Sequence, residues 1–226
     1  MVQIRKYYKK GHYHKLLAQE ADAKTMHSIR KDLERTYPDE PYFCGEYSPG
    51  RKALQRVLKA ISIELPEIGY VQSMNFIVGL LLLLSGGNEV ESFWFFVTLA
   101  KRPEFGLLGF YDEDFTLVSF LTFVFTKLAR KRESEVQEHI EEMFVPETLW
   151  IQKWLMTLYL HSFSFPMVIR IWDLMISKDI TALLQVGISI LHTHKEDILN
   201  FELEHFVEFL NGFQEVKAEE GRPHEE

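Results

Sequence analysis

Apolar residues recur at intervals of three and four along most of this chain, which is the spacing of one helix face. Ile29 and Leu33 form the first such pair. A longer stripe follows on the next predicted helix and comprises Leu54, Val57, Leu58, Ile61 and Leu65. Ser48 and Pro49 stand just ahead of this stripe. A serine cap followed by a proline in the first turn marks the beginning of a helix.

The same periodicity predicts helices along the rest of the chain. The apolar run 76–84 is followed by a Gly-Gly pair, and Asn88 is placed to cap the aromatic-rich helix that comes next. Later helices are expected over 115–128, 130–143, 149–160, 165–176, 180–191 and 198–213. No sustained alternation bounded by hairpin signals interrupts them. The sequence therefore predicts an all-α fold of about nine to eleven helices, many of them short and packed at irregular angles.

The chain reads as one domain with a polar end. Neither an internal repeat nor a Gly/Ser/Pro-rich linker divides it, so residues 1–214 are expected to fold together. Residues 215–226 include five glutamates and no aromatic residue, which predicts an acidic disordered tail. The longest apolar run has nine residues. A spanning helix needs about 20, so no transmembrane segment is expected.

Composition narrows the classes of function. The formal net charge of −8 makes the chain a poor general binder of nucleic acid, because phosphates require a basic face. Its one cysteine, Cys44, excludes an internal disulfide framework and a multi-cysteine zinc site, and we expect no metal site. The N-terminus lacks a signal-peptide core, so we expect a cytoplasmic protein.

The first segment with candidate chemistry contains Asp32 and Arg35. Residues three apart neighbour each other on a helix face, so the carboxylate can orient the guanidinium. Pro38 disfavours helical geometry at the residue before it, which places Arg35 near a helix end from which its side chain can project. Taken alone, the pair is also consistent with an ordinary surface ion pair.

The second segment contains Tyr70, Gln72 and Asn75, which lead from Gly69 into the apolar run. We expect these residues at the first turn of a helix, where free backbone N–H groups point outward. The Gln72 amide carries donors and an acceptor, so it can hold a water molecule through two contacts. The alternative is a helix start of ordinary polarity.

The third segment is the apolar stretch that carries Arg170 and Asp173. These two are again three residues apart, on one face of a predicted helix. A partly buried ion pair of this kind most often fixes packing. We therefore predict a structural Arg170–Asp173 ion pair with no part in catalysis.

Together, the order and spacing of the three segments resemble the TBC domain, the all-helical family of GTPase-activating proteins that act on Rab-type small GTPases. The matching residues are Ile29, Asp32 and Arg35 of the pattern Ile-x-x-Asp-x-x-Arg, Tyr70 and Gln72 of the pattern Tyr-x-Gln, and the run Arg-Ile-Trp-Asp at 170–173. The resemblance extends from about residue 13 to about residue 200, which is most of the chain.

The resemblance implies a mechanism with two catalytic fingers supplied in trans. Arg35 would neutralise charge on the transferred phosphoryl group, and Gln72 would orient the attacking water. It further implies that Asp32 positions Arg35, while Tyr70 and Asn75 shape or contact the switch region. GTP and magnesium would be bound by the partner GTPase, so no cofactor of this chain is expected. Partners would recruit the protein to the surface of endomembranes, in a role in vesicle trafficking.

Two departures from the family pattern leave an alternative open. Ser73 follows Gln72, where the family usually has glycine, and its hydroxymethyl group adds bulk near the reacting phosphate. The usual Arg-x-x-x-Trp helix does not precede Ile29, so the N-terminal helices are expected to be shortened. The alternative is therefore a TBC-fold scaffold, or a GTPase-binding subunit of a larger assembly, without catalytic activity.

Overall fold

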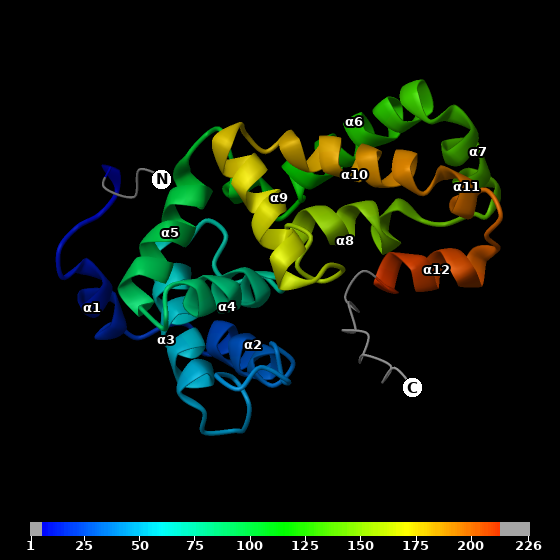
Figure 1. Cartoon of the computed structure of the whole chain (residues 1–226). Helices are drawn as coiled ribbons and strands as arrows, with labels where there is room; N and C mark the ends of the chain where they lie inside the picture. Colours follow the sequence, from blue (N-terminus) through cyan, green and yellow to red (C-terminus); the bar gives the residue numbers. More distant parts are fainter. Residues whose placement is uncertain (1–5, 213–226) are drawn as a thin grey trace, which may run out of the picture.

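The computed structural model describes residues 6–212, which form an all-helical fold without strands (Figure 1). Within this range the α-helices are α1 (His12–Leu17), α2 (Ala23–Leu33), α3 (Pro49–Glu64), α4 (Met74–Leu84), α5 (Glu89–Lys101), α6 (Thr116–Arg132), α7 (Ser134–Glu142), α8 (Ile151–Met156), α9 (Phe165–Ser177), α10 (Ala182–Thr193), α11 (Lys195–Ile198) and α12 (Leu203–Gly212). The 3-10 helices η2 (Leu107–Phe110) and η3 (Glu147–Leu149) lie among them. The predicted all-α class is confirmed. The three helices of six residues or fewer, α1, α8 and α11, bring the total slightly above the predicted range.

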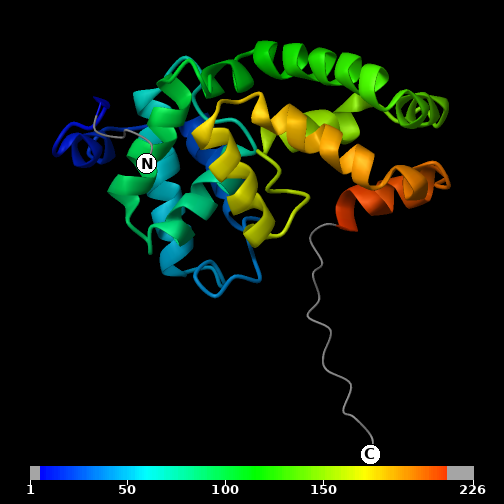
Figure 2. The same ribbon diagram turned by 45° about the horizontal axis from the view of Figure 1, so that its top comes forward.

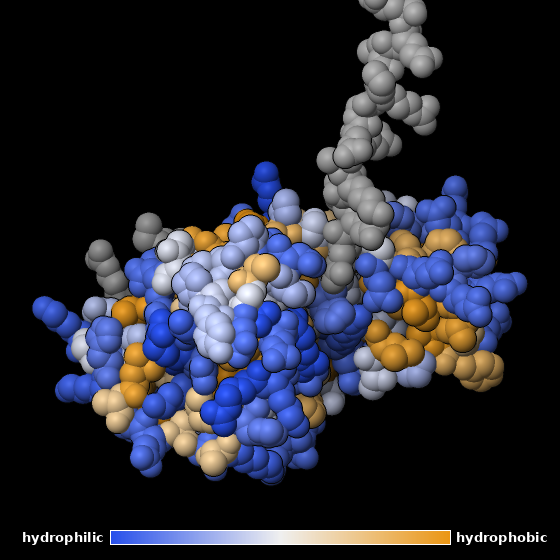
Figure 3. Space-filling model, turned by 90° about the horizontal axis from the view of Figure 1, so that it is seen from below, coloured by the Kyte–Doolittle hydropathy of each residue, from blue (hydrophilic) through white to orange (hydrophobic). Residues whose placement is uncertain are grey.

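The helices gather into two halves (Figures 1 and 2). In the N-terminal half, α3 is the central helix and contacts α1, α2, α4 and α5. In the C-terminal half, α6 packs against α7, α8 and α10. α9 lies between the halves and contacts α10. From below, the N-terminal half is mostly hydrophilic, whereas an apolar patch is visible toward the end where α7, α11 and α12 lie (Figure 3).

Two helix starts form as their sequences predict. The hydroxyl oxygen of Ser48 accepts from the backbone N–H of Arg51 across 3.3 Å, and Pro49 occupies the first turn of α3. The Asn88 side chain accepts from the N–H of Glu91 across 3.1 Å at the start of α5. Each cap satisfies a backbone donor that the helix itself leaves free. Both signals are local, which is why the sequence shows them.

The helix predicted over 130–143 is wrong as a single element. α6 continues to Arg132, the backbone turns at Glu133 with φ −135° and ψ 55°, and α7 then begins at Ser134. Glu133 is buried, and its Oε1 lies 2.7 Å from Nδ1 of His192 on α10. This long-range contact holds the turn, and no local signal in the sequence announces it.

The helix predicted over 149–160 is shorter than expected. α8 ends at Met156, and Leu158 and Tyr159 have positive φ values of 47° and 70°. The carbonyl of Leu158 accepts from the indole N–H of Trp172 on α9 across 3.0 Å. A backbone carbonyl that receives a donor from another helix is not left unpaired when its own helix stops. The chain therefore turns here, before α9 begins at Phe165.

α4 and the segment after α2 approach each other unusually closely. A Cβ added at Gly79 of α4 would meet the Tyr37 ring at 2.8 Å and the Thr36 methyl at 3.2 Å. The Tyr37 hydroxyl also donates to the backbone carbonyl of Phe76 across 2.7 Å. Gly79 therefore sets how near the residues after Arg35 lie to α4.

Two further predictions concern the ends and the surface of the chain. Residues 215–226, predicted as an acidic tail, lie outside the described residues, as does the end of the helix expected at 213. Within residues 6–212, no helix combines the length and apolar character that crossing a bilayer requires. The domain boundary predicted at residue 214 stays a prediction.

We expect Gly79→Ala to lower the free energy of unfolding by about 1–3 kcal/mol, because the added methyl group overpacks the contact with Tyr37. Gly212→Ala on α12 is the matched control, since its Cβ would meet nothing within 4 Å. Urea denaturation of both variants measures the effect. Equal midpoints for Gly79→Ala and wild type would show that α4 and the segment after α2 are not tightly packed.

Candidate functional site

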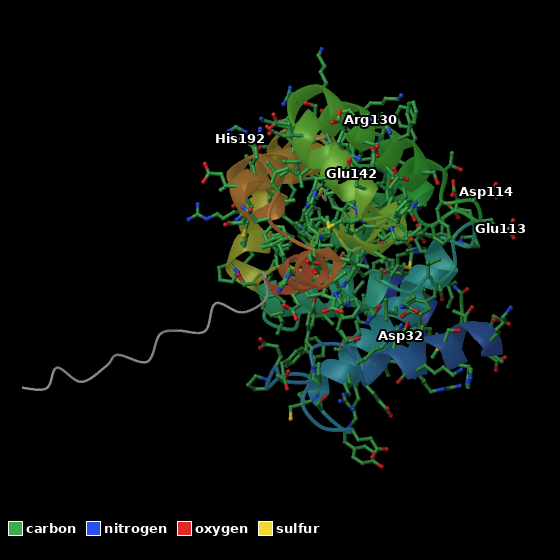
Figure 4. All side chains as sticks on the ribbon, turned by 90° about the vertical axis from the view of Figure 1, so that its right-hand side faces the viewer. Asp32, Glu113, Asp114, Arg130, Glu142 and His192 are labelled. Atoms are coloured by element: carbon green, nitrogen blue, oxygen red, sulfur yellow. The ribbon has the colours of Figure 1, made fainter. Side chains whose placement is uncertain are left out.

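Arg35 lies in the turn after α2, three residues beyond Asp32 in the last turn of that helix. Nε of Arg35 donates to Oδ1 of Asp32 across 2.9 Å, and Nη2 lies 2.7 Å from the same oxygen. The Asp32 side chain is 9% exposed and that of Arg35 is 47% exposed. Figure 4 labels Asp32, which lies on α2 in the N-terminal half. The buried carboxylate therefore orients a guanidinium that reaches solvent.

Tyr70 holds the second oxygen of the same carboxylate. Its hydroxyl donates to Oδ2 of Asp32 across 2.5 Å, although the two residues are 38 positions apart in the chain. Burial, and next the bond to the Asp32 carboxylate, raise the pKa of Tyr70 far above its usual value, so the hydroxyl remains a donor. Asp32 thus connects the segment that carries Arg35 to the segment that carries Gln72.

A second hydrogen-bonded chain joins the same two segments. The Thr36 hydroxyl donates to the backbone carbonyl of Asp32 across 2.6 Å and accepts from Nδ2 of Asn75 across 2.8 Å. Oδ1 of Asn75 accepts from the backbone N–H of Ser73 across 3.1 Å. Thr36 and Asn75 are both fully buried. Because buried polar groups are costly unless paired, this chain of bonds locks the start of α4 against the end of α2.

Gln72 is exposed and lies in the turn directly before α4. The expectation that Tyr70 and Gln72 occupy the first helical turn is wrong, because α4 begins only at Met74. Ser73, between Gln72 and the helix, has φ 96°, in a region that residues other than glycine rarely adopt. The Gln72 amide forms no hydrogen bond with another described side chain or backbone group. The turn that carries Gln72 is held by the hydrogen bond from the Ser73 N–H to Oδ1 of Asn75.

Arg35 also lines a cleft of about 480 Å³, called here the arginine cleft. Its lining includes four aromatic residues, Tyr37, Phe76, Phe163 and Phe165, together with the acidic residues Asp39 and Glu40. The Tyr37 and Phe165 rings meet edge to face with centroids 4.9 Å apart. Gln72 is not among the residues that line this cleft. The structure therefore places Arg35 at an open, largely apolar surface and Gln72 on the adjoining turn.

Two residues of this site, Thr36 and His161, were given no role from the sequence. Thr36 directly follows Arg35 and could have been noticed for its hydroxyl, which can bond to the preceding helical turn. His161 lines the arginine cleft from the turns after α8, and nothing in its local sequence marks it. Burial lowers the pKa of His161, and the charges of Lys153 and Arg35 lower it further.

Arg170 and Asp173 do not form the structural ion pair that was predicted. Both are exposed residues of α9, and no ion pair joins them in the part of the chain that the structure describes. Trp172 and Ile171 point inward instead and are 3% exposed each. Water solvates the two charges separately, so their spacing alone does not bring them together.

The described residues contain no arrangement typical of a metal centre. Within residues 6–212, no group of three or more His, Cys, Asp or Glu side chains is disposed to hold a metal ion. Cys44 is free and exposed. The chemistry available at the site is therefore that of a positioned cation, an exposed amide and an apolar cleft. Such groups stabilise charge and orient a ligand rather than form covalent intermediates.

Comparison with known proteins identifies relatives of this chain. TBC1 domain family member 1 of Bos taurus is 29% identical over 186 residues, which cover 82% of this chain and 16% of that protein. Carabin of Mus musculus is 31% identical over 181 residues, which cover 80% of this chain and 40% of that protein. This chain therefore spans less than half the length of either relative.

This chain also matches a solved structure and a family model. The TBC domain of a Chlamydomonas flagellar RabGAP superposes with a TM-score of 0.78 at 24% identity, covering 92% of this chain and 69% of that one. At that identity the similarity shows the fold alone. The family model described as the Rab-GTPase-TBC domain matches residues 1–199. On this match, which covers most of its length, the chain belongs to the Rab-GTPase-TBC domain family.

Proposed function

We propose that this chain accelerates GTP hydrolysis by a Rab-type small GTPase, with Arg35 and Gln72 acting as fingers in trans. The observation that carries the proposal is the buried Asp32 carboxylate, which bonds Arg35 through one oxygen and Tyr70 through the other. It anchors the Arg35 guanidinium and the segment leading to Gln72 to one point. Family membership supports a Rab-type partner.

Arg35 supplies the positive charge. In phosphoryl transfer, charge spreads over the oxygens of the transferred group, and an arginine supplied in trans contributes about 10³–10⁵ in rate. Asp32 restricts the orientations of the Arg35 guanidinium before the GTPase arrives. A preoriented donor has less reorganisation to complete in the transition state. The half-exposed guanidinium keeps donors free for the phosphate, because only Nε and Nη2 contact Asp32.

Gln72 orients the attacking water. Its exposed amide can accept a hydrogen bond from water through its oxygen and donate to a phosphate oxygen or a backbone carbonyl through its nitrogen. The bond from Ser73 N–H to Asn75 holds the turn on which Gln72 stands. GTP and magnesium belong to the GTPase in this mechanism, and this chain contributes side chains only.

The GTPase would dock over the arginine cleft. The apolar surface of Tyr37, Phe76 and Phe165 lies next to Arg35 and can bury the residues around the nucleotide site of the partner. Binding there excludes water from the reacting phosphate, which strengthens every electrostatic contact. Rab-type GTPases would also bring the chain to the surface of endomembranes.

Single-turnover GTP hydrolysis across a panel of Rab-type GTPases tests the two fingers. For a GTPase that wild type accelerates, we expect Arg35→Ala to lower the rate of GTP hydrolysis at least about 1,000-fold. We expect Gln72→Ala to lower the same rate at least about 100-fold, as for the loss of one transition-state donor. Arg30→Ala, at an exposed arginine of α2, is the matched control and should leave the rate unchanged. A GTPase that binds without any acceleration would instead favour the scaffold alternative.

Tyr70→Phe tests how Arg35 is positioned. Removing the hydroxyl leaves Oδ2 of Asp32 without its donor and loosens the carboxylate that orients the guanidinium. We expect the single-turnover rate at saturation to fall about tenfold, while affinity for the GTPase stays within a factor of two. Tyr47→Phe is the control, because that ring is 75% exposed. A wild-type rate for Tyr70→Phe would show that Asp32 needs only Arg35.

Ser73→Gly tests whether the residue after Gln72 limits the site. Glycine adopts φ 96° without the steric cost that serine carries, so we expect the free energy of unfolding to rise by up to about 1 kcal/mol. The hydrolysis rate should be equal or higher, since glycine also removes bulk beside the reacting phosphate. Thermal denaturation and single-turnover kinetics measure both effects. A less stable or slower variant would contradict the argument from backbone strain.

A further inference from the structure

A second cleft lies between α4, α5 and α9, which are neighbours in both ribbon views (Figures 1 and 2). Its volume is about 240 Å³, and its walls are apolar, with Leu81 from α4, Phe95 from α5 and Trp172 from α9. The Trp172 ring is fixed, because its N–H donates to the Leu158 carbonyl across 3.0 Å. We call this feature the carboxylate cleft, after the two acids that also line it.

Those acids are Glu91 and Asp173. Both are exposed, and neither forms an ion pair with any residue between 6 and 212. Glu89, two positions before Glu91, behaves differently, since it is bound by Arg56 across 2.6 Å. The carboxylate cleft therefore combines apolar walls with two negative charges that no residue between 6 and 212 pairs with.

This combination fits one kind of side chain. Arginine and lysine have an apolar stem that packs against hydrophobic walls and a cationic head that seeks carboxylates. A guanidinium or ammonium also gains from contact with an aromatic face such as those of Phe95 and Trp172. An acidic or purely apolar occupant would leave the two carboxylates opposed or desolvated without a partner.

Residues of α4 and α9 line both the carboxylate cleft and the arginine cleft. On α9, Pro166 lines the arginine cleft, whereas Ile169, Asp173 and Ile176 line the carboxylate cleft. Spacings of three and four residues place these four positions along one face of the helix. On α4, likewise, Phe76 lines the first cleft and residues of the later turns line the second.

The separation of the clefts suits a single partner. Pro166 and Asp173 are about 10 Å apart along the helix at roughly 1.5 Å per residue. A standard protein interface buries about 800 Å² on each partner, which is roughly 30 Å across when compact. A GTPase that contacts Pro166 in the arginine cleft therefore reaches Asp173 as well.

We propose that Glu91 and Asp173 receive an arginine or lysine side chain of the docked GTPase in the carboxylate cleft, and that this contact selects among Rab-type partners. The inference rests on the proposed function, because it takes the GTPase as the occupant. It assigns the acidic residue of the Arg-Ile-Trp-Asp run to partner recognition rather than to an internal ion pair. Glu91 and Asp173 act on affinity and stay remote from the reacting phosphate.

The test uses the full chain and the panel of Rab-type GTPases, loaded with GTP for hydrolysis and with a non-hydrolysable analogue for binding. The test variant is Glu91→Gln with Asp173→Asn, which removes two exposed charges and leaves size unchanged. The control is Glu138→Gln with Glu142→Gln, two exposed acids of α7 in the other half of the molecule. Glu142 is labelled in Figure 4. For an accelerated GTPase, we expect the test variant to raise KM about tenfold and keep kcat within twofold. The control should match wild type.

Each outcome decides one of the two proposals. An unchanged KM in the test variant overturns the role of the carboxylate cleft and leaves the proposed function standing. Binding without acceleration overturns the proposed function, and the dissociation constants of wild type and test variant then decide the role of the cleft. If no GTPase binds or responds, both proposals fail.

Replacing the exposed lysines and arginines of the responding GTPase by alanine, one at a time, identifies the occupant. One substitution should raise KM about tenfold with the wild-type chain and less than twofold with the test variant, because the contact is already lost there. If every substitution has the same effect on both chains, no basic side chain occupies the cleft.

Discussion

The buried carboxylate of Asp32 is the constraint on which the rest of the site depends. Taking an ion out of water costs several kcal/mol unless charged or hydrogen-bonding partners replace the lost hydration. Arg35 supplies a cation on one side and Tyr70 a hydroxyl on the other. These partners lie on separate segments, so the charge is satisfied only when the end of α2 and the approach to α4 have met. The site is therefore complete only in the folded domain.

α4 provides the surface on which this assembly rests. The helix is apolar on nearly every side and is mostly buried, as expected for a helix in the interior of a domain. Its first turn is different, because Asn75 carries a polar side chain into the interior and bonds to Thr36 and Ser73. Gly79 then lets Tyr37 lie directly against the helix. The exposed Arg35 side chain is thus attached to a segment that packs tightly against α4.

α9 contributes residues to both clefts. Its inward face carries Trp172, whose indole N–H donates to the Leu158 carbonyl in the turn that follows α8. Another face runs from Pro166 beside Arg35 to Asp173 beside the second cleft. One helix therefore offers apolar contact near the reacting groups and negative charge about 10 Å away. A partner that covers both would be held by burial at one end and by charge at the other.

The sequence by itself determined what depends on neighbours along the chain: the all-α class and the caps at Ser48 and Asn88. Helix periodicity and capping involve residues a few positions apart, so their signals are visible in one dimension. Only the tertiary structure decided that Tyr70 completes the site, because that contact joins positions 38 residues apart. Arg170 and Asp173 have the same spacing as Asp32 and Arg35 and yet stay apart. The physical reason is burial: a carboxylate removed from water must find a partner, whereas one left in water need not.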